Sequence, residues 1–350
     1  MSTAITYILP IKSQRRIAPE LIAYLDHLSR SGAVAEVIVV DGSGREIFAD
    51  FATRCGPDVR HIPVDPDFSG LLNGKVGGVL TGVRHAAHDR LILADDDVRY
   101  DDGTIEKIAR ALDRADIVRP QNYFQPLPWH ACIDTSRTLI NRVTGGDWPG
   151  TFALRRQALI STGGYDGNVM FENLELVRTI RAGGGREHQA PDLFVRRHPP
   201  DTAHFWSQRV RQAYDEFARP GRLVCWLSII PGISALVARY GFSALSIAAV
   251  VCIAVAESGR RIHRGTSVYP LRASLVAPLW VIERAITAWL AVAVRVIYGG
   301  VWYSGRRVAR AATPYRELVS RFSARVTSPT GDGTLKVGTI EPNVGRGMTA

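Results

Sequence analysis

Cysteine is scarce in this 350-residue chain, and the four that occur are Cys55, Cys132, Cys225 and Cys252. No two of them form a Cys-x-x-Cys pair, which argues against a zinc site or a redox motif with that spacing. Two of the four lie in apolar stretches, where cysteine packs as a small hydrophobic residue. The cysteine pattern therefore indicates a protein of a reducing compartment.

Lysine is also rare, so the formal net charge of +10 comes almost entirely from arginine. No motif that reads bases or stacks on them is visible, which argues against nucleic acid as the partner. The mean hydropathy is near zero although 22% of the residues are charged, so the apolar residues must be concentrated in part of the chain. Basic charge beside apolar stretches favours an anionic membrane face as the partner.

Long apolar runs are missing from the first 220 residues and gather between Leu223 and Val301. The N-terminus shows no signal-peptide pattern, because the strand-like run Ile5–Leu9 begins almost at once. We therefore expect three regions. These are a cytoplasmic α/β domain over 1–220, membrane-associated helices over 221–310, and a cytoplasmic basic segment with a disordered tail over 311–350.

Strand-like and helix-like segments alternate in the N-terminal half. Ile5–Pro10 predicts a strand, Pro19–Arg30 has helical spacing, and Val37–Val40 predicts a second strand that ends at Asp41 in a glycine-rich turn. A strand, a helix and a strand in this order predict an α/β fold with a parallel sheet. Asp41 would then lie at the ligand-binding edge and accept hydrogen bonds from a nucleotide, or it serves only in a plain turn.

The most unusual stretch is an apolar run that ends in three consecutive acids, Asp95, Asp96 and Asp97. The run predicts a buried parallel strand, whose carboxyl end is where open α/β sheets bind ligands. A divalent cation such as Mg²⁺ would relieve the repulsion between the acids and bridge them to a substrate phosphate. The alternative is a solvated acidic turn.

A glycine-rich segment, Leu71–Val79, precedes this acidic strand end. Its glycines allow the backbone to approach a phosphate closely, and Lys75 supplies a positive point charge. The spacing differs from that of a Walker A loop, so the segment does not indicate that class of nucleotide site.

Two glutamates, Glu172 and Glu175, lie three residues apart in a predicted helix that begins at Val169. They can share one helix face, and either could act as a general base. The alternative is that both acids simply favour the positive end of the helix dipole.

Farther along, His204–Ala218 predicts one amphipathic helix that carries Gln208 and Arg211. Its arginines would bind a pyrophosphate, or the basic helix adheres to a membrane surface. Two other segments are less regular. Arg119–Arg142 is rich in proline and aromatic residues, which predicts a loop or short helix, either at an interface or as a packed connection. Pro191–Arg197 predicts an edge strand.

Two apolar regions follow, Leu223–Ala256 and Leu271–Tyr303. The first predicts either two short spans hinged near Arg239–Gly241 or one span with an in-plane helix. The second contains Glu283 and Arg284, which we expect to pair, to face protein or to lie at an interface. Basic clusters after both regions favour the cytoplasm, which makes the second region re-entrant or a tightly kinked hairpin.

Taken together, these residues resemble the motifs of membrane-bound family 2-type glycosyltransferases of the GT-A fold, most closely the ceramide glucosyltransferase-like branch. The matching segments are Asp41, Asp95–Arg99, Gly150–Arg156, Glu172–Asn173, Gln208–Gln212 and Gly299–Arg306. The likeness spans residues 5–310 and rests on the order and spacing of the motifs. Two positions depart from the pattern, because Asn173 replaces an acid that often serves as the base and Gln212 replaces a tryptophan.

The resemblance implies a Rossmann-like GT-A domain for a nucleotide sugar, followed by C-terminal membrane helices. It implies an inverting transfer of a sugar from a UDP-linked donor to a lipid, at the cytoplasmic leaflet of the cell (inner) membrane. Donor-binding residues would be Asp41, Lys75, Asp95, Asp96, Gln208 and Arg211. Asp95 and Asp97 would hold Mg²⁺ or Mn²⁺, and Glu172 would be the catalytic base, with Glu175 the next candidate.

Two other functions fit the sequence. One is a polyprenyl-phosphate sugar synthase, whose acceptor is already an anion and needs no strong base, which would suit Asn173. The other is a catalytically silent membrane scaffold that binds nucleotide sugars.

Overall fold

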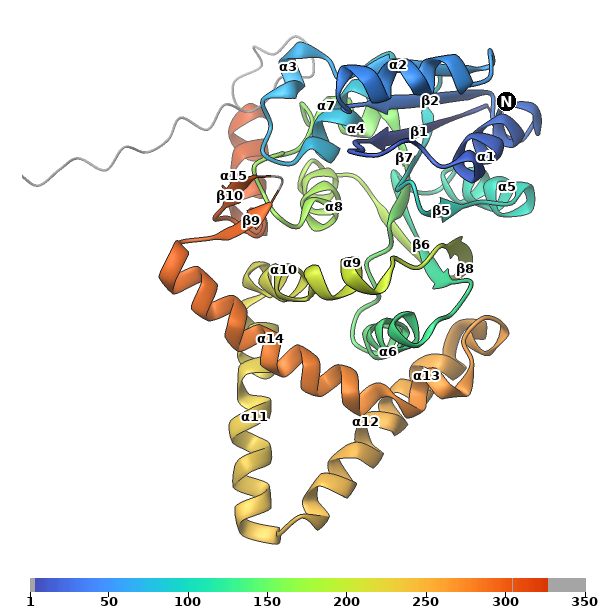
Figure 1. Cartoon of the computed structure of the whole chain (residues 1–350). Helices are drawn as coiled ribbons and strands as arrows, with labels where there is room; N and C mark the ends of the chain where they lie inside the picture. The colour runs from blue at the N-terminus through green and yellow to red at the C-terminus, as the bar shows by residue number, and fades with distance from the viewer. Residues whose placement is uncertain (1–3, 304, 327–350) are drawn as a thin grey trace, which may run out of the picture.

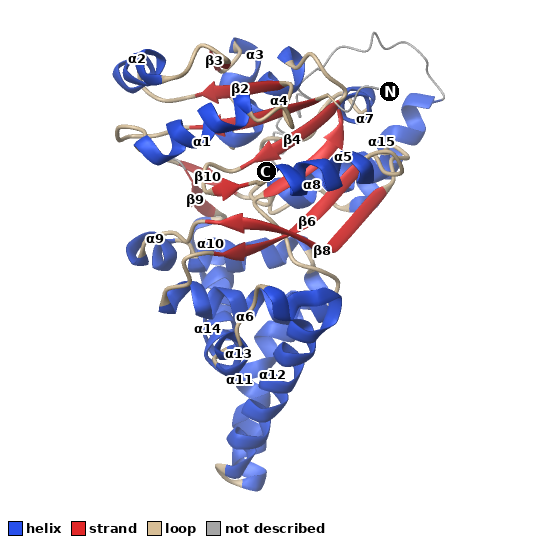
Figure 2. Cartoon of the chain, turned by 90° about the vertical axis from the view of Figure 1, so that its right-hand side faces the viewer, coloured by secondary structure: helices blue, strands red, loops and turns tan. Residues whose placement is uncertain are grey.

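The computed structural model describes residues 4–303 and 305–326. An α/β domain stands on a layer of helices, and a helical hairpin projects from that layer on the side away from the domain (Figure 1). Figure 2 shows the strands running across the α/β domain, with the hairpin at the far end of the molecule. The N-terminal strand lies inside the α/β domain, as its apolar sequence predicts.

The central sheet has eight strands in the order β3-β2-β1-β4-β7-β6-β8-β5. The strands are β1 (Ile5–Ile11), β2 (Glu36–Asp41), β3 (Val59–Pro63), β4 (Arg90–Ala94), β5 (Val98–Arg99), β6 (Ile117–Phe124), β7 (Thr151–Arg155) and β8 (Glu187–Arg197). The first four in this order are parallel, whereas β7 runs antiparallel to both of its neighbours. The carboxyl ends of β2 and β4 therefore meet at one edge of the sheet.

Helices cover both faces of the sheet and enclose two apolar cores. One face is covered by α1 (Pro19–Arg30), α2 (Arg45–Arg54) and α5 (Asp102–Ala111), and the other by α3 (Pro66–Ser69), α4 (Gly74–His85), α7 (Arg156–Ser161) and α8 (Glu172–Ala182). The close approach of α4 to β1 needs glycine, because a Cβ at Gly82 would lie 2.3 Å from Cγ2 of Ile8. This approach brings the start of α4, with Lys75, to the ligand edge.

The helical layer connects the α/β domain to the projecting hairpin. The layer and the hairpin together comprise α6 (Trp129–Val143), α9 (Thr202–Ser207), α10 (Arg209–Tyr214), the 3₁₀ turn η1 (Asp215–Ala218), α11 (Pro220–Tyr240), α12 (Ser243–Arg261), the 3₁₀ turn η2 (Ile262–Ser267), α13 (Leu271–Leu275) and α14 (Ala277–Tyr298). Within the described residues, two helical segments, Pro220–Tyr240 and Ser243–Ser267, are long and apolar enough to cross a membrane. They form the hairpin, with a break at Gly241 as one of the two sequence alternatives predicts.

The chain returns from α14 to the α/β domain. A short hairpin of β9 (Val301–Tyr303) and β10 (Arg306–Val308) leads to α15 (Tyr315–Val326), which packs against α8. On the way, the backbone N–H of Phe171 donates to the carbonyl of Ala311. Residues 311–326, expected as a basic segment, are thus attached to the α/β domain. The predicted disordered tail, 327–350, lies outside the described residues, and the three-part domain division stays a proposal.

Several local predictions are wrong. Arg119–Arg142 is not a loop or short helix, because it forms most of β6 and α6 on either side of the prolines. The predicted single helix His204–Ala218 breaks into α9, α10 and η1, and the glutamate helix begins at Glu172 rather than Val169. The edge prediction for Pro191–Arg197 holds for most of the segment, since β5 pairs outside β8 only at Arg196 and Arg197. The α/β class with apolar C-terminal helices is confirmed.

Packing between α6 and α12 requires a glycine, which gives a testable prediction. A Cβ at Gly259 would lie 1.9 Å from the backbone oxygen of Leu139, so Gly259→Ala forces the two helices apart. We expect a loss of stability of about 1–3 kcal/mol from overpacking, measured as a lower melting temperature in detergent. The matched control is Gly232→Ala on α11, where a Cβ meets nothing within 4 Å. Equal melting temperatures for the two variants would contradict this packing.

Candidate functional site

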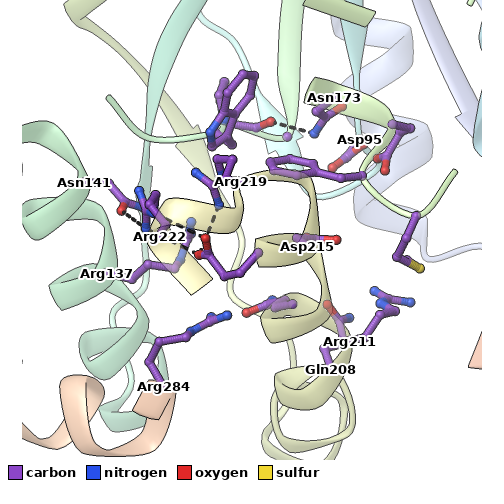
Figure 3. A pocket seen from close by; sticks show the side chains of 18 of the residues that line it. Asp95, Arg137, Asn141, Asn173, Gln208, Arg211, Asp215, Arg219, Arg222 and Arg284 are labelled. Atoms are coloured by element: carbon purple, nitrogen blue, oxygen red, sulfur yellow. Dashed lines mark hydrogen bonds and ion pairs between the residues drawn. The ribbon is translucent and has the colours of Figure 1, made fainter. Parts of the chain in front are cut away.

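A cavity of about 190 Å³ lies between the ligand edge of the sheet and the helical layer. Four of the residues predicted to act in the site line it, namely Asp95, Glu172, Gln208 and Arg211. They come from the end of β4, the start of α8 and the α9–α10 segment. Figure 3 labels Asp95, Gln208 and Arg211 among the side chains around the cavity. The fold thus brings together side chains that are far apart in the sequence.

The acidic strand end is held by two cationic side chains. Nζ of Lys75 lies 2.6 Å from Oδ1 of Asp95 and 3.0 Å from Oε1 of Glu172. The guanidinium of Arg197, at the end of β8, lies 3.3 Å from Asp95 and 2.9 Å from Asp97. Asp95 is therefore the centre of a network that connects β4, α4, α8 and β8.

Burial and charge shift the pKa values of this network. Burial disfavours the charged form of Lys75, but Asp95 and Glu172 outweigh it and raise the pKa of the lysine. Burial raises the pKa of Asp97 to about 6, although Arg197 opposes this increase. Burial and the adjacent Asp95 also raise the pKa of Asp96, which does not line the cavity. The acids are thus close enough to repel one another, as the sequence predicts.

The donor atoms of this cluster suit a hard divalent cation, since carboxylate oxygens are its preferred ligands. Asp95 and Asp97 contact the same guanidinium, so their oxygens converge on a single positive charge. Side-chain cations take up that charge here, and the described residues contain no group of three or more acidic, histidine or cysteine side chains arranged as a metal site. Asp95 and Asp97 could therefore bind Mg²⁺ or Mn²⁺ if the cation replaced the guanidinium of Arg197 as their partner.

Asp41 lies apart from the cavity, at the carboxyl end of β2. Its Oδ1 accepts from the backbone N–H of Ser43 at 2.7 Å, and its Oδ2 contacts Nε2 of His61 at 3.1 Å. Burial raises the pKa of Asp41, but His61 and Ser43 outweigh it and lower the pKa overall. Phe48 stacks on His61 at a centroid distance of 4.1 Å. A role of Asp41 in nucleotide binding stays a prediction.

The two glutamates of α8 do not share one environment. Glu172 lines the cavity, whereas Glu175 is fully buried and its Oε2 accepts from the backbone N–H of Thr313 at 2.6 Å. Glu175 therefore holds the segment after β10 against α8 and does not reach the cavity. The assignment of the catalytic base to either residue stays a prediction. Glu172 is the better placed of the two, because its side chain lines the cavity.

The two positions that depart from the family pattern are both near the cavity. Nδ2 of Asn173 donates to the carbonyl of Pro149 at 3.1 Å. Oε1 of Gln212 accepts from Arg209 at 3.0 Å. Gln208 contacts His204, and Arg211 lies over the ring of Tyr303 at 5.1 Å. The amide at position 173 thus acts as a donor to the backbone.

Several residues that line the cavity were not predicted. These are Arg137, Arg197, Asp215, Arg219, Arg222 and Arg284. Asp215 lies four residues after Arg211, and that helical spacing was the one indication of its place in the sequence. The arginines come from four separate elements, so their convergence depends on the tertiary fold.

One protein-family model and several solved structures are similar to this chain. The family model described as Glycosyl transferase family 2 matches residues 8–163. No curated protein matches the sequence significantly. The structure is similar to a mannosyltransferase from Pyrobaculum calidifontis solved with GDP-Man and Mn²⁺, with 17% identity, TM-score 0.46, and coverage of 81% of this chain and 86% of that chain.

Two further solved structures are similar. Mannosyl-3-phosphoglycerate synthase from Rubrobacter xylanophilus has 14% identity, TM-score 0.41, and coverage of 60% of this chain and 74% of that chain. Glucosyl-3-phosphoglycerate synthase from Mycobacterium tuberculosis, solved with Mn²⁺, UDP and phosphoglyceric acid, has 16% identity, TM-score 0.38, and coverage of 60% and 76%.

The sheet, the acidic strand end and the family match define the class of protein. The chain has a Rossmann-like GT-A fold with C-terminal helices that are candidate membrane spans. Residues 8–163 match the model of glycosyl transferase family 2, and this match together with the fold supports a nucleotide-sugar glycosyltransferase of the GT-A type. The predictions of fold class and enzyme class are confirmed.

Proposed function

We propose that this glycosyltransferase moves a sugar from a UDP-linked donor to a membrane lipid, with inversion at the anomeric carbon. The observation that carries the proposal is the position of the cavity. Its acidic side is formed by the end of β4, and its opposite side by residues at the start of α11 and in the first half of α14. A donor at the sheet and a lipid at the helices would therefore meet inside one cavity.

The helical layer supports a membrane location. At 1.5 Å per residue the 21 residues of α11 extend about 30 Å, which is the thickness of a bilayer core. The outer face of α14 exposes Leu279, Ile282, Ile286 and Trp289, whereas its inner face is buried. Such a helix suits the membrane interface. We propose that α11 and α12 cross the cell (inner) membrane as a multi-pass hairpin and that α14 lies on its cytoplasmic face.

In this proposal the donor binds along the edge of the sheet. Asp41 would contact the nucleotide, and Lys75, Gln208 and Arg211 would contact its diphosphate. Asp95, with Asp96 beside it, would face the diphosphate through the cation held by Asp95 and Asp97. A bound divalent cation would offset the negative charge that grows on the leaving diphosphate.

Inversion requires a single displacement. The acceptor oxygen attacks the anomeric carbon from the face opposite the diphosphate, and a carboxylate accepts its proton, a role that the sequence assigns to Glu172. An α-linked donor would give a β-linked product. Glu172 lines the same cavity as Asp95, and both carboxylates contact Nζ of Lys75.

Ligand-induced stabilisation tests the donor. A panel of nucleotide sugars is added to the purified protein in detergent with and without Mn²⁺, and the melting temperature is measured. A ligand that binds only the folded state raises it in proportion to occupancy. We expect one donor to stabilise the protein, and more strongly with the cation. Stabilisation without donor turnover in the presence of lipid would instead support the silent scaffold.

One observation favours a second function, a polyprenyl-phosphate sugar synthase. Arg284 is 3% exposed and lines the cavity, and its Nε has no hydrogen-bond partner in the described part of the chain. A buried guanidinium with an open donor suits an anionic acceptor, because arginine binds phosphate in a fork. A lipid product that mild acid cleaves would identify a sugar phosphate, whereas a glycoside survives.

Replacing Arg284 tests whether the acceptor carries a phosphate. Arg284→Gln keeps a hydrogen-bonding side chain but removes its charge. Because hydrogen bonds to charged groups contribute about 1.5–3 kcal/mol, we expect the KM for an anionic lipid to rise about 10- to 100-fold. The donor-induced shift in melting temperature should not change. An unchanged KM for anionic lipids would exclude Arg284 from acceptor binding.

A further inference from the structure

The residue at the position expected to hold the base cannot accept a proton in this protein. Asn173 is an amide, and its Nδ2 is already used to donate to the carbonyl of Pro149. Glu172 lies at the same end of the cavity, but its Oε1 is held by Lys75 at 3.0 Å, and Lys75 also binds Asp95. Glu172 therefore lies on the side of the cavity where the donor would bind.

A third carboxylate in the cavity, Asp215, is not held by Lys75 in this way. Asp215 is the first residue of η1, the turn between α10 and α11, and it lines the same cavity. Its Oδ1 is shielded from solvent and has no hydrogen-bond partner in the described part of the chain. Figure 3 shows its side chain between Arg219 and Arg211, on the side of Asp95 and Asn173 that faces the helical layer. A lipid that enters from that layer would meet Asp215 before it reached the donor.

We infer that Asp215, rather than Glu172, accepts the proton of a lipid hydroxyl during sugar transfer. This inference rests on the proposed transfer to a lipid and adds that the attacking group is a hydroxyl. The acceptor O–H bond breaks and its proton passes to the carboxylate of Asp215. The acceptor oxygen forms the new bond to the anomeric carbon, and the bond to the diphosphate breaks with its electron pair on the leaving group.

The surroundings of Asp215 suit this role. Burial, and then the charge of Glu172 on α8, raise the pKa of Asp215 to about 8 against the opposing effect of Arg219 and Arg211, and Glu216 adds to the increase. A general base acts best when its pKa lies near the working pH, because it is then both available and basic. The open Oδ1 provides the acceptor atom that such a proton needs.

The pH dependence of the wild-type enzyme gives the first test, which needs no variant. The base must be ionised, so kcat/KM should rise tenfold per pH unit below the pKa of Asp215 and level off above about pH 8. The charged groups that act on Asp215 are Glu172, Arg211, Glu216 and Arg219. A profile that is flat between pH 6 and about 9 would overturn the inference.

The second test compares Asp215→Asn with Glu172→Gln. Loss of a general base costs about 10²–10⁴-fold in kcat, and we expect this loss in Asp215→Asn. The inflection near pH 8 in the pH profile of kcat/KM should also disappear in this variant. Donor-induced stabilisation should persist, which also shows that the variant is folded. Glu172→Gln should keep an inflection, moved to lower pH because the charge of Glu172 raises the pKa of Asp215, and should weaken donor binding instead. If Asp215→Asn turns over at the wild-type rate, or if Glu172→Gln alone loses the inflection, the inference is wrong.

The acidity of the acceptor gives a third test, which a purely structural role would not pass. A phenolic lipid needs less help from a base than an alkanol lipid, because its proton leaves more readily. The deficit of Asp215→Asn should therefore shrink at least tenfold with the phenol. An equal deficit for both acceptors would overturn the inference. Wild-type enzyme that makes no lipid glycoside with any acceptor would remove the proposed function itself, which separates the two failures.

Discussion

Replacing both Asp95 and Asp97 by asparagine is expected to reduce sugar transfer about a thousandfold or more. A metal ion supplies several kcal/mol of stabilisation to the charge that develops in such a reaction, and each 1.36 kcal/mol corresponds to a factor of about ten. Asparagine keeps the size of the side chain but removes the charge that would hold the cation. Initial rates with saturating Mn²⁺ measure the effect.

The matched control is Asp67→Asn, since Asp67 is an exposed carboxylate that pairs with Arg84 far from the cavity. This variant should retain the wild-type rate. A chelator should reduce the wild-type rate about as much as the double substitution does, and added Mg²⁺ or Mn²⁺ should restore it. A double variant that keeps more than a tenth of the wild-type rate would exclude the acidic strand end as the catalytic cation site.

Loss of Arg209 is expected to destabilise the protein by about 3–5 kcal/mol, the usual effect of removing one partner of a buried ion pair. Arg209 is 2% exposed, and its guanidinium lies 3.0 Å from Asp134 on α6 and 2.6 Å from Glu283 on α14. In Arg209→Leu the buried Asp134 and the partly buried Glu283 would lose a shared cation. The free energy of unfolding in detergent measures the change.

The pH dependence of this effect has a definite sign. Burial raises the pKa of Asp134, but Arg137 and Arg209 outweigh it and hold the pKa far below its ordinary value. A lowered pKa gives stability that is present above the unfolded pKa of about 4 and is lost as the pH falls further. The difference between wild type and Arg209→Leu should therefore shrink below about pH 4.

Two comparisons make the prediction specific. Arg16→Leu removes an exposed ion pair with Asp50 and should leave the free energy of unfolding nearly unchanged. Adding Asp134→Leu and Glu283→Leu to Arg209→Leu should recover most of the lost stability, because the two carboxylates that Arg209 neutralises are then gone. If Arg209→Leu and Arg16→Leu were equally stable, the buried network would not join α6, α10 and α14 as described.

The ligand edge of the sheet could be predicted from the sequence because the residues that determine it lie close together in the chain. The run before Asp95 is apolar and ends in charge, which fixes both the strand and the position of the acids at its end. The glycines of Leu71–Val79 allow close packing, since a Cβ at Gly78 would lie 2.6 Å from Cβ of Pro10 on β1, and the approach to a phosphate stays a prediction. In both cases the residues that determine the feature are neighbours in the chain.

The acceptor side could not be predicted in the same way. Prolines near Phe124 and Trp129 hide the strand and the long helix on either side of them, because proline usually ends regular structure. The burial of Asp215 comes from its position between α8, α10 and α11, so its sequence neighbours do not reveal it. Glu175 was a reasonable candidate by spacing, but one turn of helix directs it toward Thr313 instead of the cavity.

Transfer of label into lipid tests the central claim most directly. Purified protein in liposomes of mixed phospholipids is incubated with Mn²⁺ and the nucleotide sugar that stabilises it, labelled in the sugar, and the organic extract is counted. We predict labelled lipid with the wild-type protein and a β-linked sugar in that product. Label that stays in the aqueous phase with every donor, or an α-linked product from an α-linked donor, would contradict the account.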